Sequence, residues 1–177
     1  MRVVGIEDGS FKKGVTKRTL IAAVLFDGLK IEDVKLSRID VDGLDATEKV
    51  VNILTEWEFE VVMLAGVSFA GFNIIDHTVL FKKFAKPILI ISRTKPDNKA
   101  VKYALRAHFR DWQIRWGVFE KLGPVQKVTP LAKENPLYCE ILGADAHWAK
   151  RLIKDLAVCG RVPEPLRVAR LVARGLS

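Results

Sequence analysis

The chain opens with Val3-Val4-Gly5-Ile6-Glu7-Asp8-Gly9-Ser10-Phe11, in which an apolar run leads directly into two carboxylates. The apolar part, Val3 to Ile6, predicts a short buried strand in the interior of a sheet. Adjacent acids at the end of such a strand repel each other and raise each other's pKa. A bound divalent cation would remove that cost. The alternative interpretation of the same residues is an ordinary Asp-Gly turn after a strand.

Composition indicates one globular domain, residues 1–177, because a chain that is 49% hydrophobic and 28% charged can bury a core of its own. No apolar run reaches membrane-spanning length. The start of the chain, with only Arg2 before a short apolar stretch, is not typical of a signal peptide. Cys139 and Cys159 lack metal-ligand spacing and are expected to be reduced, buried thiols in a cytoplasmic protein.

The balance of charge favours a polyanionic partner. The chain has 29 Lys and Arg residues against 21 Asp and Glu residues, for a net charge of +8. A basic surface attracts polyanions, above all the phosphates of nucleic acids.

The hydrophobic pattern predicts an antiparallel opening followed by alternating helices and strands. Thr19 to Phe26 and Ile31 to Ile39 join Val3 to Ile6 as strands, with Asp27-Gly28 as the turn between the second and third. The periodicity of the remaining chain predicts helices at 45–57, 73–84 (with Asn73 as N-cap), 96–109, 111–121, 145–158 and 165–174, and strands at 61–64, 88–91, 126–129 and 138–142. This α/β layout matches a ribonuclease H-like fold, with a mixed central sheet (an antiparallel opening meander, then parallel strands) and helices on both faces.

Several segments resemble known nucleases. Asp8-Gly9-Ser10 resembles the Asp-Gly-Ser that ends the first strand of ribonuclease H, and with Phe11 it resembles the Asp-x-Ser-aromatic of endonuclease V. Arg161 to Arg167 is similar to the Arg-x-Pro-Glu-Pro-x-Arg segment near the end of endonuclease V. Val41 to Lys49 and Ala70 to Asn73 resemble the largely archaeal family described as endonuclease dU, a relative of endonuclease V. The resemblance covers nearly the whole chain.

What this resemblance implies is a metal-dependent endonuclease that hydrolyses phosphodiester bonds in DNA at deaminated bases, deoxyuridine in particular, in DNA repair. Carboxylates would hold Mg²⁺ or Mn²⁺, which activates water and stabilises the leaving oxygen. The implied partner is DNA, single-stranded or carrying a lesion, with RNA as an open alternative and no membrane.

The same resemblance points to a set of acidic residues. Asp8 matches the first-strand acid of both relatives and is the first candidate ligand, while Glu48 lies one residue from the place of a Glu in endonuclease V. Glu48 is alternatively the acid of a helix capping box. Glu7 is either a second catalytic acid or faces the other side of the sheet, because strand side chains alternate. Asp42 and Asp145 complete the candidate metal ligands, with a helix cap as the alternative for Asp145.

Two departures from endonuclease V favour a second hypothesis. Ala65-Gly66 stands where endonuclease V has Asp-Gly, and Leu142 to Asp145 stands where it has a His. A site that lacks both residues is either rebuilt or lost. The alternative function is therefore a catalytically inactive nucleic-acid-binding module on a ribonuclease H-like fold. A nucleotide-binding α/β domain has no support, because the chain has neither a P-loop nor a dinucleotide fingerprint.

Candidate nucleic-acid-binding residues lie in three loops. Basic side chains suit phosphates, and a glycine-containing loop with aromatic residues suits the approach of a backbone or the stacking of a base. The candidates are Lys12, Lys13, Ser68, Phe69, Gly71, Phe72, Arg93 and Lys95. For the loop that contains Phe69 and Phe72, the alternative is a strand-to-helix connection with both rings in the core.

Overall fold

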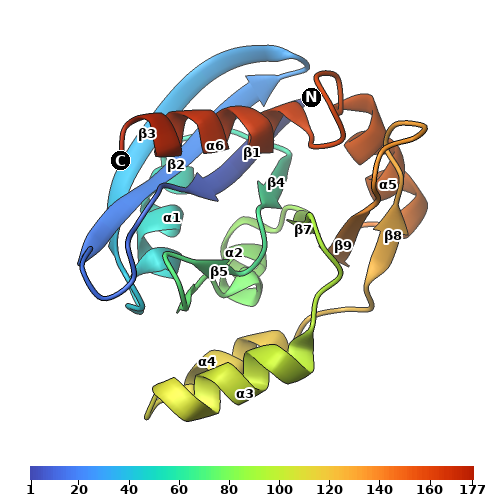
Figure 1. Cartoon of the computed structure of the whole chain (residues 1–177). Helices are drawn as coiled ribbons and strands as arrows, with labels where there is room; N and C mark the ends of the chain where they lie inside the picture. Colours follow the sequence, from blue (N-terminus) through green and yellow to red (C-terminus); the bar gives the residue numbers. More distant parts are fainter.

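The computed structural model describes residues 1–177 and contains a seven-stranded mixed sheet with helices on both faces (Figure 1). The sheet order is β3-β2-β1-β4-β7-β9-β8. Its strands are β1 (Arg2–Asp8), β2 (Arg18–Asp27), β3 (Lys30–Asp40), β4 (Val61–Leu64), β7 (Ile88–Ser92), β8 (Gln126–Val128) and β9 (Leu137–Leu142). The first three strands are antiparallel, β4 and β7 run parallel to β1, and β9 returns antiparallel to β7. The predicted interior position of β1 and the antiparallel opening are confirmed.

The helices divide between the two faces. One face carries α1 (Ala46–Thr55), α2 (His77–Phe84), α3 (Asn98–His108) and α4 (Trp112–Phe119), and the other carries α5 (Ala146–Asp155) and α6 (Glu164–Gly175). Along β1, Val4 and Ile6 pack in the cluster under α1 to α4, whereas Val3 packs in the cluster under α5 and α6. None of these helices has the length and apolar character needed to cross a membrane.

The predicted helix at 73–84 is wrong in its first turn. Asn73 lies in β6 (Asn73–Ile74), which pairs with β5 (Ser68–Phe69), and α2 begins only at His77 with Asp76 as its N-cap. The side chain of Asn73 is fully buried and donates to Asp45 Oδ1 at 2.6 Å. It therefore serves a tertiary contact rather than the local cap that its residue type predicts.

The two cysteines have different environments. Both are free, as expected, but only Cys139 is buried, and burial raises the pKa of its thiol to about 12. Cys159 is exposed, which corrects the expectation of two buried thiols. Cys159 lies in the loop between α5 and α6, outside the buried core.

Helix α6 approaches β1 unusually closely. A Cβ on Gly5 would lie 2.2 Å from the carbonyl carbon of Pro165, so the strand needs glycine at this position. The segment that resembles the endonuclease V tail fixes this approach. Arg161 Nη1 donates to the carbonyl oxygen of Pro136 at 2.8 Å, and Glu164 holds Arg167 through two hydrogen bonds. These contacts lay α6 across β1 and β2 (Figure 1).

Candidate functional site

The two acids at the end of β1 point to opposite faces of the sheet, as strand alternation requires. Asp8 continues the series of Val4 and Ile6 and faces α1. Its Oδ2 accepts a hydrogen bond from the backbone N–H of Ala70 at 2.6 Å. Glu7 faces the side of α6. The adjacent carboxylates therefore do not share one site.

A strained turn between β5 and β6 joins Asp8 to Asp42. The carbonyl oxygen of Ala70 accepts from the N–H of Asp42 at 2.8 Å, and Asp42 Oδ1 accepts from the N–H of Phe72 at 2.8 Å. Asp42 and Ala70 both have positive φ, of 57° and 44°. A Cβ on Gly71 would lie 2.2 Å from Asp42 Oδ1. Backbone strain of this kind persists where the surroundings enforce it, and it is concentrated at functional sites.

Each of these two carboxylates keeps one oxygen free of protein hydrogen bonds, Oδ1 in Asp8 and Oδ2 in Asp42. No group of three His, Cys, Asp or Glu side chains lies close enough to hold a metal ion. The donor set nevertheless fits Mg²⁺ or Mn²⁺, because Mg²⁺ is usually bound by one or two carboxylates, waters and substrate phosphates rather than by a complete protein cage. Asp8 and Asp42 are the residues that could hold such an ion.

The remaining predicted ligands lie elsewhere. Glu48 is exposed in the first turn of α1 and makes no hydrogen bond, so the capping box does not form. Asp45 instead accepts from Asn73. Asp145 caps α5 on the opposite face of the sheet and accepts from the N–H of His147 at 2.9 Å. Ala65 packs in the cluster under α5 and α6, away from the face of Asp8.

Glu7 belongs to a mixed charge cluster beneath α6. Its Oε2 accepts from both Nη1 and Nη2 of Arg93, at 3.2 and 3.1 Å. Burial raises the pKa of Glu7, and the charge of Arg93 opposes this shift. Burial also lowers the pKa of Arg170 on α6, helped by Arg93 and Arg174. Three guanidinium groups thus gather near the end of β1, and arginine is well suited to phosphate oxygens.

The predicted nucleic-acid residues fall into separate groups. Lys13 and Phe72 line a pocket of about 270 Å³ that also includes Asp42, whereas Ser68 and Lys95 line a second pocket of about 370 Å³. The other candidates offer less. Phe69 is 1% exposed and belongs to the core, Gly71 is packed against Asp42, Arg93 is held by Glu7, and Lys12 is exposed in the loop after β1.

Two features escaped the sequence analysis. Glu140 is buried within β9, where a lone acid in the run Tyr138 to Leu142 was the available signal. The second is a basic surface on α3, which with α4 stands below the sheet in Figure 1. It is an open surface on one side of the helix, formed by Lys99, Lys102, Tyr103, Arg106 and Ala107. The signal was the helical spacing of the three basic residues.

An interior first strand that ends in an acid, with antiparallel strands on one side and β4 and β7 running parallel to it on the other, is the arrangement of a ribonuclease H-like fold, as predicted. The structure is similar to endonuclease V of Ciona intestinalis, crystallised with a 24mer DNA containing an inosine followed by a ribo-adenosine. The TM-score is 0.67 at 14% sequence identity, over 99% of this chain and 84% of that chain.

The chain belongs to the endonuclease dU family, whose model matches residues 1–177. A UPF0215 protein of Thermococcus gammatolerans is 37% identical over 180 residues, which cover 98% of this chain and 90% of the relative. A crystal structure from Archaeoglobus fulgidus, described as a protein of unknown function, has a TM-score of 0.86 at 26% identity and covers 99% of this chain and 97% of that one. Family and fold confirm the predicted relationship and together support a nuclease.

Proposed function

We propose that this protein is a divalent-metal-dependent endonuclease that cuts DNA at deaminated bases, with deoxyuridine as its principal lesion, and that it acts in DNA repair. The observation that carries the proposal is the turn that holds Asp8 and Asp42 on one face of the sheet, each with a free carboxylate oxygen. The family description supports the substrate class.

Asp8 and Asp42 would hold Mg²⁺ or Mn²⁺, and the ion when bound supplies an activated water and polarises the phosphate. Glu48 is exposed and unpaired on the same face of the sheet, but it does not form a three-ligand group with Asp8 and Asp42. Glu7 and Asp145 are better explained by the ion pair with Arg93 and by the cap of α5. The protein's own contribution is to position the substrate phosphate beside the carboxylates.

Basic surfaces support DNA as the partner. The guanidinium groups of Arg93 and Arg170 lie next to the acidic end of β1, and the basic surface of α3 extends away from the sheet. Such surfaces neutralise phosphates without reading sequence, so binding should weaken as salt rises.

The second candidate function is a binding module without catalysis. It is favoured by the absence of a three-ligand cluster and by Ala65, which lies where endonuclease V has an acid. It requires DNA binding without cleavage at any metal concentration.

The two candidates separate in one cleavage assay. Labelled oligonucleotides with deoxyuridine, deoxyinosine or no lesion are incubated with Mg²⁺, Mn²⁺ or EDTA. Asp8→Asn keeps an oxygen for the N–H of Ala70 but loses the charge, and we expect cleavage to fall by at least about 100-fold, the scale of a lost transition-state contact.

Asp145→Asn is the matched control, because asparagine caps a helix as well as aspartate does. This variant should cleave like the wild type. Cleavage that survives both EDTA and Asp8→Asn would refute the metal-dependent mechanism. Binding without cleavage under every metal condition would establish the binding module instead.

A further inference from the structure

Glu140 is a buried acid without a complete set of partners. Its side chain is 3% exposed, and Oε2 has no hydrogen-bond partner. Burial raises the pKa of Glu140, and only its own backbone amide opposes the shift. An unsatisfied buried acceptor destabilises a fold, so its presence calls for an explanation. Neither the candidate metal site nor the packing of the core uses this carboxyl group.

Glu140 forms part of the wall of the 370 Å³ pocket. Apolar side chains such as Ile90, Val101 and Phe119 line it together with polar residues that include Ser68 and Lys95. Its volume lies in the usual range for small-ligand sites, and six of its fifteen lining residues are hydrophobic. A cavity of this composition suits a flat heterocycle with polar edges.

The register of the sheet places this pocket beside the acidic end of β1. Glu140 lies opposite Ile90, Ile90 lies opposite Leu64, and Leu64 lies opposite Ile6. Glu140 therefore shares the face of Ile6 and Asp8, three strand spacings or roughly 14 Å across the sheet. A DNA strand with a phosphate at Asp8 can reach the pocket with a nearby base turned out of the stack.

Deamination changes one ring position from an acceptor to a donor. Cytosine N3 carries a lone pair, whereas uracil N3 carries a hydrogen, and the same change converts adenine N1 into the N–H of hypoxanthine. An ionised carboxylate can only accept, so its free oxygen can bond that N–H and opposes a lone pair, whereas the protonated acid could also donate to the lone pair. An acceptor at this point therefore distinguishes the deaminated base from its parent.

We propose that this pocket binds a nucleobase turned out of DNA, and that Glu140 recognises deamination by accepting a hydrogen bond from the ring N–H, that of uracil above all. The inference rests on the proposed action on DNA. It adds a recognition residue that is separate from the candidate metal ligands.

The test measures binding in EDTA, where the proposed cleavage does not occur. Fluorescence anisotropy compares single-stranded oligonucleotides that differ only in one central deoxyuridine or deoxycytidine. We expect the wild type to prefer deoxyuridine by at least about 10-fold, the scale of a hydrogen bond to a buried group. Glu140→Gln should reduce the ratio of the affinities for the deoxyuridine and deoxycytidine oligonucleotides, because the glutamine amide can also donate to cytosine N3.

Glu140→Leu should abolish the preference while raising Tm, because it removes the unsatisfied acceptor. Glu134→Gln is the control, since Glu134 is exposed in the loop before β9 and its side chain makes no hydrogen bond. The control should keep the wild-type ratio. A wild-type ratio near one, or a preference that both Glu140 variants retain, would overturn the inference.

Cleavage of the same oligonucleotides with Mn²⁺ separates the two proposals. If the Glu140 variants cleave lesion-specifically and discriminate as the wild type does, the endonuclease proposal stands and the role of Glu140 in recognition is refuted. If the wild type never cleaves but shows a preference for deoxyuridine that depends on Glu140, the recognition pocket stands and the endonuclease proposal is refuted.

Discussion

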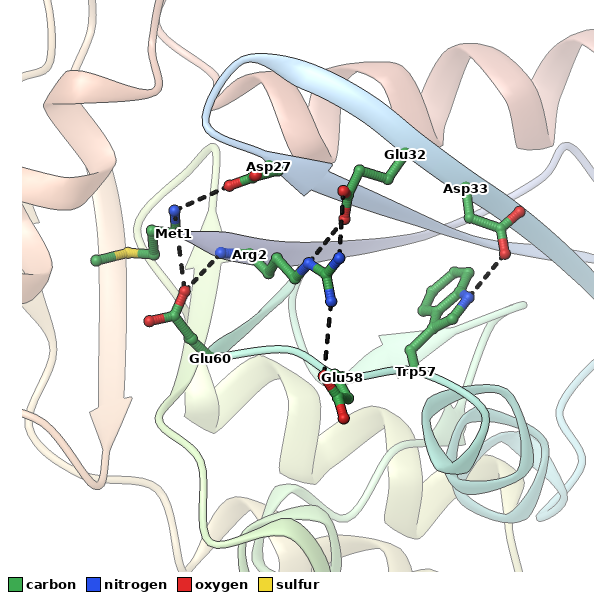
Figure 2. A network of polar contacts seen from close by, with 8 residues as sticks. All are labelled: Met1, Arg2, Asp27, Glu32, Asp33, Trp57, Glu58 and Glu60. Carbon is green, nitrogen blue, oxygen red and sulfur yellow. Dashed lines mark hydrogen bonds and ion pairs between the residues drawn. The ribbon is translucent and has the colours of Figure 1, made fainter.

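The two ends of the central sheet treat their charges differently. At the end where β1 begins, the charged groups pair with one another, as Figure 2 shows. We call this the paired end, formed by Met1, Arg2, Asp27, Glu32, Glu58 and Glu60. The amino terminus lies 3.0 Å from Asp27, and Arg2 Nε lies 2.9 Å from Glu32. A cavity of about 510 Å³ opens here, and three of its four charged wall residues, Arg2, Glu58 and Glu60, are already partnered, whereas Lys86 is not.

At the opposite end, where β1 finishes, some carboxylate oxygens have no hydrogen-bond donor from the protein. We call it the acidic end, formed by Asp8, Asp42 and Glu140 with Arg93 and Arg170 nearby. Unlike the acids of the paired end, none of these three acids forms an ion pair, and each has an oxygen without a protein partner. Ionisable groups that the fold does not satisfy are candidates for function, whereas satisfied ones serve structure. This difference is the reason why we propose the site at the acidic end, although the cavity at the paired end is larger than the pocket that contains Glu140.

The largest expected effect tests how the acidic end is assembled. Helix α6 brings Arg170 to this end, and it can approach β1 only because residue 5 is glycine. Gly5→Ala should lower the free energy of unfolding by about 3 kcal/mol, because the added methyl group meets rigid backbone. Urea denaturation measures the change.

Gly175→Ala in the same helix is the control for this substitution. A Cβ at this position meets nothing within 4 Å, so stability should stay the same or rise by up to about 1 kcal/mol. If Gly5→Ala is as stable as the wild type, close packing does not hold α6 in place.

An intermediate effect compares the ion pairs of the two ends. Arg93→Ala leaves Glu7 buried without its partner and should cost about 2 kcal/mol, less than a fully buried pair because Arg93 is 32% exposed. Arg2→Ala removes a pair whose arginine is 42% exposed and should cost at most about 1 kcal/mol. Chemical denaturation at neutral pH would measure both costs.

Removing the charge of Glu7, which Arg93→Ala leaves without a partner, sharpens this comparison of ion pairs. Adding Glu7→Gln to Arg93→Ala should recover part of the loss, because no buried charge then remains. Equal costs for Arg93→Ala and Arg2→Ala would mean that the two ends do not differ in the way their charges are held.

The smallest expected effect concerns how folding stability depends on pH, because Asp33 and Glu140 should change it in opposite directions. Next to the paired end, the hydrogen bond from Trp57 Nε1 lowers the pKa of Asp33. The ionised Asp33 therefore stabilises the fold above the ordinary pKa of 3.8, and this stabilisation is lost as pH falls through the folded-state pKa. The pKa of Glu140 is raised by burial, so its ionisation destabilises the fold as pH rises above the ordinary 4.5.

Two variants measure these slopes through Tm at several pH values. Asp33→Asn should be less stable than the wild type near neutral pH, and the deficit should shrink in acid. Glu140→Gln should gain stability over the wild type as pH rises. Parallel curves for the two variants would contradict the assigned shifts.

Much of the fold was predictable because its signals are local. Continuous apolar runs predicted β4 and β7 nearly to the residue, and Asp27-Gly28 correctly predicted the turn between β2 and β3. The prediction failed at Asn73, where a good capping residue is used instead for buried contacts to Asp45. A local pattern cannot reveal a partner that lies 28 positions away.

The sequence by itself determined the ribonuclease H-like layout and the family, and it singled out Asp8 as the first candidate ligand, because strand periodicity and a short motif are properties of neighbouring residues. Only the tertiary structure decided which acids meet. It paired Glu7 with Arg93 across 86 positions, brought Asp42 to Asp8 through the β5–β6 turn, and left Glu140 unpartnered in a pocket. The physical reason is that hydrogen bonding and burial depend on distances in space, and these are set only when distant segments pack together.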